Sequence, residues 1–363
     1  MSTDIFLSNL NNIFDENCIK TDSSNKEKYR NDWSTDHQSN PIAIVFPKET
    51  EQVIDVLKLC NEFEYPLIGS GGRTGLSGGA SATSEELIVS FDKMNSILEF
   101  DENSNTVLCQ PGLITQNLQS FADDNNLYYP VDFSSAGSSQ VGGNIATNAG
   151  GIRVLKYGST SRYVEGLEVI TGDASYFCMD DMLVKNATGP NLKNLFIGSE
   201  GIFGLTVSSR MKLINKPLDT SVVLIGFDDI SSLDKISNSI FEYDIEAVEF
   251  FTFNSLTKVH EAFDQVEVGH LKNNYYLIVE LYDQKGFTNF LEKIYTDNLA
   301  QEIIVSTNSA QKKSIWQYRL LISESITRSR PIKLDIAVPL KNITKLIEKL
   351  ELFFKDKKSY DLV

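Results

Sequence analysis

Apolar positions in the first two hundred residues recur with two spacings, which predict strands alternating with helices. Residues 42–46 are a short apolar run typical of a buried strand, and residues 66–68 form a second such run. Between them, apolar residues repeat with the spacing of one helix face, at Val53, Val56, Leu57 and Cys60. Thr50 can cap this helix. The region is therefore predicted to be a β-α-β unit that buries a parallel pair of strands beneath a helix.

The pattern continues as far as Pro217 and then changes. Further strands are expected at residues 87–91, 97–100, 107–110, 167–171, 177–179 and 205–213, and a helix is expected over residues 114–122. Residues 131–160 are rich in small and amide residues and show little periodicity. After Pro217 glycine is scarce, and helical patterns surround two strand-like runs, 222–227 and 275–281. We expect a helix and loose arm over residues 1–36, followed by two domains, 37–217 and 218–363.

Composition and charge narrow the class of protein. The chain has 363 residues and a mass of 40.6 kDa, a size at which two domains are common. Its 33 Lys and Arg against 49 Asp and Glu give a formal charge of −16, which argues against nucleic acid or an anionic bilayer as the main partner. No run approaches the ~18 apolar residues that cross a bilayer, and the first residues lack the basic start of a signal peptide. The four cysteines form no CxxC pair and are expected to be reduced core residues of a cytoplasmic protein.

A glycine-rich loop follows the strand predicted at residues 66–68. Six of the eleven residues from Gly69 to Gly79 are glycine. Glycine lets a ligand approach the backbone closely, and successive free N–H groups form a cradle for an anion such as a pyrophosphate. The dinucleotide fingerprint G-x-G-x-x-G fails because position 74 is Thr74, and no Gly-Lys-Ser/Thr of a Walker loop follows. The loop is therefore a phosphate cradle of another type or, alternatively, a tight turn or a linker.

Two more segments of small residues come later in the chain. Residues 134–151 alternate small residues with amide and hydroxyl groups, which suits contact with a planar ring rich in heteroatoms. The alternative is a packing seam between elements. Residues 198–204, with the sequence GSEGIFG, carry only a weak signal by themselves.

In this order and spacing, the three segments resemble the FAD-binding domain of the vanillyl-alcohol oxidase and p-cresol methylhydroxylase (PCMH) superfamily. Pro41 and Pro47 precede the loop, VGGNIATNAGG lies in the second segment, and Arg153 and Tyr157 follow it. Within the superfamily, the chain resembles the branch of the glycolate oxidase subunit, D-lactate dehydrogenase and D-2-hydroxyglutarate dehydrogenase. The resemblance implies an α+β fold, with a two-subdomain PCMH-type FAD-binding domain. A cap domain of the FAD-linked oxidase C-terminal type, an antiparallel sheet covered by helices, would lie over the flavin.

The resemblance also implies which residues bind FAD. The pyrophosphate loop corresponds to Gly69, Ser70, Gly71, Gly72, Arg73, Thr74, Gly75, Ser77, Gly78 and Gly79. The flavin-contacting residues correspond to Gly137, Ser138, Gly142, Gly143, Asn144, Thr147, Gly150, Glu200, Gly201 and Ile202. Residues 69–79 contain no histidine of the kind that attaches FAD in some relatives, so the FAD is expected to be non-covalent. Arg73, which replaces a common glycine, is expected either to brace the phosphate or to face solvent.

For the substrate, the resemblance implies hydride transfer from the carbinol carbon of a 2-hydroxy acid to the flavin. The segment from Trp316 to Arg319 resembles the W-x-x-R motif of the family, and Arg319 would bind the substrate carboxylate. Ser323, one helical turn further on, is expected on the same face. Lys333 resembles the second cationic contact of the family. Alternatively, Arg319 and Lys333 are ordinary surface charges.

The family places a base for the hydroxyl proton, and in several members the ligands of a divalent metal, in a C-terminal H-x-G-D-G-N-x-H segment. This sequence contains no such segment, and His37, His260 and His270 do not match it, so the chain is interpreted as truncated and without a metal site. We expect an FAD-dependent dehydrogenase of a D-2-hydroxy acid such as D-lactate, glycolate or D-2-hydroxyglutarate, with a quinone or an electron-carrier protein as acceptor. The alternatives are an oxidoreductase for another alcohol and a catalytically impaired FAD-binding subunit or fragment; homodimer formation stays open.

Overall fold

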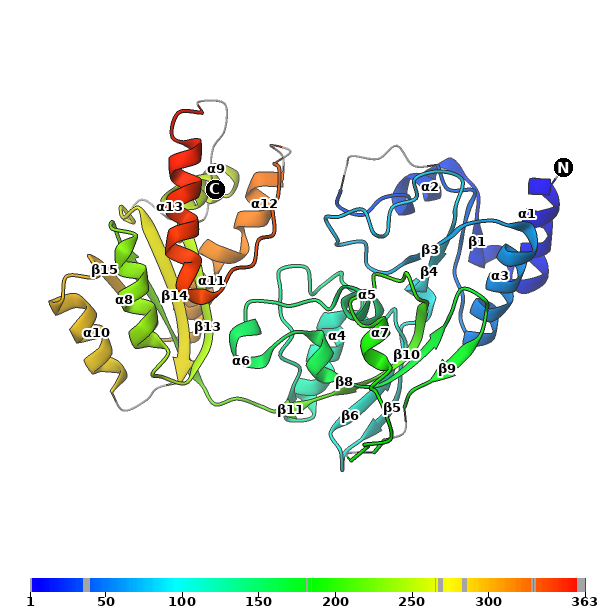
Figure 1. Ribbon diagram of the computed structural model, residues 1–363, viewed down its shortest axis with the longest axis horizontal. Helices are drawn as coiled ribbons and strands as arrows, with labels where there is room; N and C mark the ends of the chain where they lie inside the picture. The colour runs from blue at the N-terminus through cyan, green and yellow to red at the C-terminus, as the bar shows by residue number, and fades with distance from the viewer. Residues whose placement is uncertain are drawn as a thin grey trace. The chain divides into compact units, whose positions relative to one another are not determined.

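The computed structural model describes residues 2–34, 40–180, 182–183, 185–264, 266, 270–282, 286–327, 329, 331–357 and 363 (Figure 1). The chain forms two compact units. The N-terminal unit contains residues 1–151 and 157–217, and the C-terminal unit contains residues 152–156 and 218–363. The boundary expected between residues 36 and 37 lies outside the described residues. None of the helices in the described ranges is long and apolar enough to cross a membrane.

The first sheet of the N-terminal unit is mainly parallel. Its strands lie in the order β1 (Ile19–Lys20), β2 (Ala43–Val45), β4 (Leu87–Ser90) and β3 (Leu67–Ser70). The strands β2 and β3 are parallel, as the β-α-β prediction expects, but they do not pair with each other because β4 lies between them. The helix α3 (Thr50–Phe63) connects them, but Glu49 occupies the N-cap position and Thr50 is already helical. The apolar runs fit a sheet buried on both faces.

The N-terminal residues belong to this core: the helix expected at the start of the chain is present, and the segment after it, expected to be a loose arm, buries Cys18 and Tyr29. The helix α1 (Ser2–Ile13) lies against α3, and the turn η1 (Glu16–Cys18) and α2 (Ser23–Tyr29) follow. The first helix buries Phe6 and Leu10, and Phe6 stacks on Tyr65 with ring centroids 4.2 Å apart. Every third or fourth residue of this short segment is apolar, and the sheet supplies the surface that covers them.

The second sheet of the N-terminal unit is antiparallel throughout. Its order is β5 (Ile97–Asp101), β6 (Thr106–Cys109), β10 (Leu205–Lys212), β8 (Val164–Ile170) and β9 (Tyr176–Cys178). The helices α4 (Thr115–Asp124) and α5 (Val141–Thr147) contribute to its core, and β7 (Leu127–Tyr128) pairs with β11 (Ile214–Asn215). The shorter elements of the unit are η2 (Phe91–Lys93), η3 (Thr160–Tyr163) and α7 (Lys193–Phe196). Cys178 is exposed, unlike the three buried cysteines, so its assignment to the core is wrong.

The C-terminal unit is one antiparallel sheet with helices on both faces (Figure 1). The strand order is β13 (Ile245–Thr252), β14 (Tyr275–Tyr282), β12 (Thr220–Phe227) and β15 (Glu302–Val305). Alternate residues of β12 enter two separate cores. One core contains α9 (Phe253–Ala262) and α11 (Ser309–Leu320), and the other contains α8 (Ser231–Ile240) and α10 (Phe287–Thr296). The remaining elements are α6 (Val154–Tyr157), whose last residue belongs to the other unit, α12 (Ile322–Thr327), η4 (Leu340–Asn342) and α13 (Ile343–Phe354).

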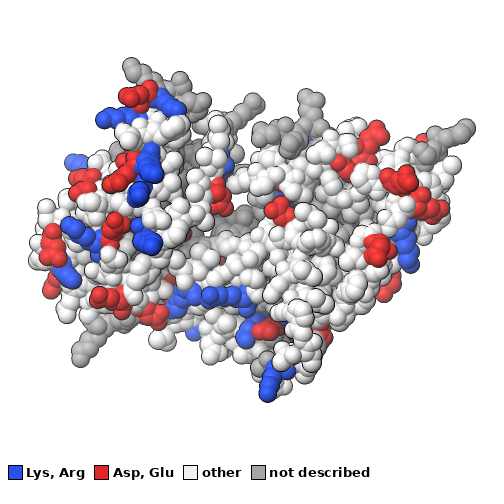
Figure 2. Space-filling view, viewed as in Figure 1, with Lys and Arg blue, Asp and Glu red and all other residues white. Residues whose placement is uncertain are grey.

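Charges on the C-terminal unit are mixed. Figure 2 shows acidic and basic side chains interspersed over the visible face of this unit. The excess of acidic residues in the sequence is therefore not gathered into one acidic area on that face.

Candidate functional site

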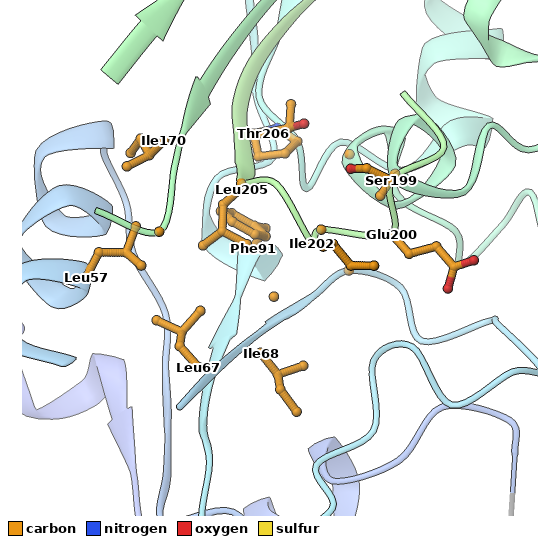
Figure 3. A pocket seen from close by; sticks show the side chains of 18 of the residues that line it. Leu57, Leu67, Ile68, Phe91, Ile170, Ser199, Glu200, Ile202, Leu205 and Thr206 are labelled. Atoms are coloured by element: carbon orange, nitrogen blue, oxygen red, sulfur yellow. The ribbon is translucent and has the colours of Figure 1, made fainter. Parts of the chain in front are cut away.

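The N-terminal unit contains a cavity of about 510 Å³ where its three glycine-rich segments meet. One side is formed by Leu67, Ile68 and Gly69 of β3, and the opposite side by Ile170 and Leu205 of the second sheet. Figure 3 shows these apolar side chains, together with Phe91, around the space. The volume and the apolar lining are typical of a site for a small organic ligand or cofactor.

Missing side chains make room in this cavity. A Cβ atom added at Gly143 would meet nothing within 4 Å, so the main chain of α5 borders open space there. At Gly69 the main chain lies so close to β10 that a Cβ atom would be 2.6 Å from Leu205 Cδ2. At Gly72 it would be 2.2 Å from the carbonyl oxygen of Ser138, which brings the first and second glycine-rich segments into contact. Gly72 needs glycine because its neighbours are main-chain atoms, whereas at Gly69 the Leu205 side chain would have to move, and Gly143 leaves space that a ligand can fill.

The main-chain amides of the first loop are available for an anion over much of its length. No described residue accepts a hydrogen bond from the amides of residues 71–77. The later part of the loop is held differently, because Gly78 N–H donates to Asp32 Oδ2 at 2.9 Å and Trp33 N–H donates to the Gly75 carbonyl at 3.0 Å. The loop thus combines an anchored end with a run of unused donors, as an anion cradle requires.

Arg73 is held inside the unit by a small polar cluster. Its guanidinium carbon lies 4.2 Å from the centre of the Tyr29 ring, and its Nη1 lies 3.9 Å from Asp92 Oδ1. The Tyr29 hydroxyl donates to Asp92 Oδ2 at 2.6 Å, and Gln140 Nε2 donates to Asp92 Oδ1 at 2.8 Å. Asp92 therefore connects Arg73 of the first loop with Gln140, which immediately precedes α5.

The cavity collects part of the cofactor set predicted from the sequence. The residues of that set that line it are Gly69, Gly71, Gly79, Gly142, Gly143, Glu200, Gly201 and Ile202. The residues that do not line it are Ser70, Gly72, Arg73, Thr74, Gly75, Ser77, Gly78, Gly137, Ser138, Asn144, Thr147 and Gly150. At least one residue that does not line the cavity stabilises a helix that does. Asn144 is buried and donates to Thr115 Oγ1 at 2.7 Å, which fixes α5 to α4.

Sequence reasoning missed the apolar half of the cavity. Its lining includes Leu57, Cys60 and Asn61 from α3, as well as Phe91 and Ile170. These residues follow the ordinary pattern of core positions, and no local signal separates a side chain facing a cavity from one facing another side chain. Gly172 follows Thr171 in the turn after β8, and a Cβ atom there would meet nothing within 4 Å. It is the one glycine among the lining residues that lies outside the three predicted segments, and its turn signal could have marked it.

The residues predicted to bind substrate lie in the C-terminal unit. Arg319 is in the last turn of α11, and its Nε donates to Glu249 Oε2 of β13 at 2.5 Å. Ser323 is exposed in α12, a separate helix after a turn at Leu321, so the expected continuous helix face is interrupted. Lys333 is exposed outside any helix or strand, and partial burial lowers the pKa of its ammonium group.

A buried ion cluster, which the sequence did not reveal, lies in the same unit. The Glu280 side chain is 1% exposed and lies 3.0 Å from Arg153 Nη2 and 2.6 Å from Lys312 Nζ. Burial by itself raises the pKa of Glu280, but Arg153, Lys312 and Thr220 outweigh it and hold that pKa below its usual range. Glu246, also 1% exposed, lies 2.5 Å from Lys156 Nζ. The cluster fixes residues 152–156 within the C-terminal unit.

Known proteins match both parts of the chain. The FAD binding domain family model matches residues 41–178, and the family model of the C-terminal domain of FAD linked oxidases matches residues 216–360. A D-2-hydroxyglutarate dehydrogenase of Stutzerimonas stutzeri is 37% identical over 97% of this chain and 77% of its own length. A protein of the same name from Xanthomonas citri pv. viticola is 34% identical over 88% of this chain and 69% of its own. A crystal structure of p-cresol methylhydroxylase superposes with a TM-score of 0.69 at 17% identity, over 88% of this chain and 69% of that one.

The matching family model identifies an FAD binding domain, the fold is shared with p-cresol methylhydroxylase, and the α+β architecture expected from the sequence is confirmed. The chain belongs to the family of FAD-linked oxidases that includes these D-2-hydroxyglutarate dehydrogenases. The resemblance drawn from the three glycine-rich segments is therefore confirmed. Among the described residues, no group of three or more His, Cys, Asp or Glu side chains is arranged to hold a metal ion.

Proposed function

We propose that this chain is an FAD-dependent dehydrogenase that oxidises a D-2-hydroxy acid to the 2-oxo acid. The observation that carries the proposal is the cavity bordered by the three glycine-rich segments, in a chain 37% identical to a D-2-hydroxyglutarate dehydrogenase over 97% of its length. An FAD in this site supplies an acceptor for the hydride that leaves the carbinol carbon of the substrate. D-2-Hydroxyglutarate is the first substrate to test, and D-lactate and glycolate are the next.

The cavity fits an FAD through its main chain and its apolar wall. The amide of Gly71, which lines the cavity, and the amides of residues 72–77, which follow it outside the lining, would bind the pyrophosphate. The space beside Gly143 would accept part of the nucleotide. We propose that binding is non-covalent. Cys60 lines the cavity, but burial raises the pKa of its thiol to about 12, so a thiolate able to form a flavin linkage is scarce at neutral pH.

Substrate recognition is assigned to the C-terminal unit. Arg319 would bind the carboxylate of the 2-hydroxy acid through paired N–H donors, which match the geometry of a carboxylate. Lys333 would add a second positive charge, and Ser323 would donate a hydrogen bond. The exposure of Ser323 and Lys333 supports this assignment, because a ligand can reach both side chains.

The test is anaerobic reduction of the bound flavin. The purified chain is expected to hold FAD, and its visible absorbance should fall when D-2-hydroxyglutarate is added but not when the L-isomer is added. A yellow protein that no D-2-hydroxy acid bleaches would favour the catalytically impaired FAD-binding subunit. A colourless protein that fails to take up added FAD would contradict both.

The electron acceptor that we propose is a quinone or an electron-carrier protein. Reoxidation of the substrate-reduced enzyme should be faster with a soluble quinone analogue than with air-saturated buffer. Faster reoxidation by oxygen would make the protein an oxidase instead. Size-exclusion chromatography with light scattering decides whether the chain is a homodimer.

A further inference from the structure

The ion pair between Arg319 and Glu249 determines how the arginine can meet a ligand. Arg319 Nε lies 2.5 Å from Glu249 Oε2, the arginine side chain is 31% exposed, and the glutamate side chain is 18% exposed. The glutamate is on β13, the edge strand of the sheet, and the arginine is at the end of α11, which packs against this sheet (Figure 1). The pair therefore joins a hydrogen-bonded strand of the sheet to the proposed substrate contact.

The guanidinium group has two edges that can each grip a carboxylate with two N–H donors. One edge uses Nε and one terminal nitrogen, and the other uses both terminal nitrogens. Glu249 already takes the Nε donor. Among the described residues, none accepts a hydrogen bond from Nη1 or Nη2 of Arg319. A ligand carboxylate can therefore make a two-point contact with Arg319 only through the edge formed by Nη1 and Nη2.

We propose that Glu249 is a positioning residue, which holds Arg319 so that its two terminal nitrogens face the carboxylate of the 2-hydroxy acid. This inference rests on the proposed function. A long arginine side chain loses much conformational freedom when it binds a ligand, and a partner that orients it beforehand removes part of that cost. Glu249 suits the task because it comes from a strand and is mostly shielded from water. Its burial raises its own pKa, which the charge of Arg319 opposes.

The competing explanation is an ordinary ion pair that only stabilises the unit. The two explanations differ in what the loss of Glu249 changes. A stabilising pair would alter the melting temperature and leave substrate affinity unchanged in the folded enzyme. A positioning residue would alter the apparent affinity for the hydroxy acid and leave the bound FAD intact.

The experiment measures flavin reduction by D-2-hydroxyglutarate in the FAD-loaded full chain. Glu249→Gln keeps the size and one acceptor oxygen, and Glu249→Ala removes both. We expect the substrate concentration for half-maximal reduction to rise about tenfold in Glu249→Ala and less in Glu249→Gln, with a smaller change in the limiting rate. In an Arg319→Ala background, Glu249→Gln should add no further effect, because nothing is left to orient.

The matched control is Glu302→Gln. Glu302 is on β15, the opposite edge strand of the same sheet, and burial also raises the pKa of its carboxyl group. In this variant, the substrate concentration for half-maximal flavin reduction should equal that of the wild type. Unchanged affinity in both Glu249 variants, at wild-type FAD content, would overturn the inference, as would an additive effect in the double variant.

A failure of the proposed function gives a different result. In that case the wild-type flavin is not reduced by any D-2-hydroxy acid. The inference is then tested by binding alone, through the shift of the flavin spectrum or calorimetry with D-2-hydroxyglutarate or 2-oxoglutarate. The expected order of affinity stays the same, with wild type tightest, Glu249→Gln next and Arg319→Ala weakest. Equal affinities in wild type and the Glu249 variants would overturn it.

Discussion

In the N-terminal unit, main chain borders the cavity at Gly71, Gly142 and Gly143, whereas the C-terminal unit gathers buried charges around Glu246 and Glu280. The first arrangement depends on glycines, which leave open space beside the main chain and amides that have no acceptor among the described residues. The second depends on side chains that are present and that lie against opposite charges. A cofactor held along its whole length needs a surface without projecting atoms, while a unit that presents a charged contact needs neighbours that hold charges in place. The difference predicts opposite responses to substitution.

Adding a side chain should damage the first arrangement most. Gly143→Leu is expected to lower FAD affinity by at least a hundredfold, because the new side chain fills the open space beside α5. FAD content after purification and the dissociation constant of added FAD measure this change. Gly143→Ala is the control, since a single methyl group meets no atom within 4 Å and favours the helix. Full FAD retention by the leucine variant would show that the cofactor lies elsewhere.

Removing a side chain should damage the second arrangement most. Glu280→Ala leaves Arg153 and Lys312 without their shared carboxylate, and losing one member of a buried ion pair costs about 3–5 kcal/mol. The free energy of unfolding of the C-terminal unit in urea should fall by this amount. Glu261→Ala, which removes the exposed partner of Lys258, should cost at most about 1 kcal/mol. Equal losses in the two variants would mean that the cluster is no more strongly coupled than a surface pair.

The same cluster predicts a response to acid. The pKa of Glu280 is lowered in the folded protein, so its contribution to stability is present above the unfolded pKa of about 4.3 and is lost as the pH falls through the folded value. Unfolding free energy of the C-terminal unit should therefore decline below about pH 4–5. Glu280→Gln should flatten this decline while lowering stability at neutral pH. A decline of the same slope in the variant would assign the acid sensitivity to other carboxylates.

The contrast also separates what the sequence could predict from what it could not. Glycine segments are local signals, so their order and spacing carried the family resemblance. That resemblance predicted Gly69, Gly143 and Gly201 as cofactor residues, and all three line the cavity. The helix α5 was missed because its two glycines have low helix propensity and its stability comes from packing in the second core. The strand β4 could not be placed between β2 and β3, because apolar runs do not encode strand order.

The ion pairs of the C-terminal unit could not be predicted, because they join residues that lie far apart in the sequence. Arg153 reaches Glu280 only because residues 152–156 leave the N-terminal unit and join the C-terminal one. Neither carboxylate of the cluster is distinguishable in the sequence from the other acidic residues of the unit. The partner of Arg319 was hidden for the same reason, since Glu249 is on a strand far earlier in the chain.

The smallest expected effect is at Glu302, whose carboxyl group has a raised pKa, in contrast to the lowered pKa of Glu280 in the ion cluster. Burial raises the pKa of Glu302, and the charge of His270 only partly opposes this. The folded protein therefore binds the proton more tightly than the unfolded chain, and stability falls as the pH rises from about 4.3 through the raised value. Glu302→Gln removes the ionisable group, so it should leave neutral-pH stability unchanged or raise it by less than about 0.5 kcal/mol, unlike Glu280→Ala. Thermal melting at two pH values measures this, and a clear loss of stability would show that Glu302, too, is held by a charge partner.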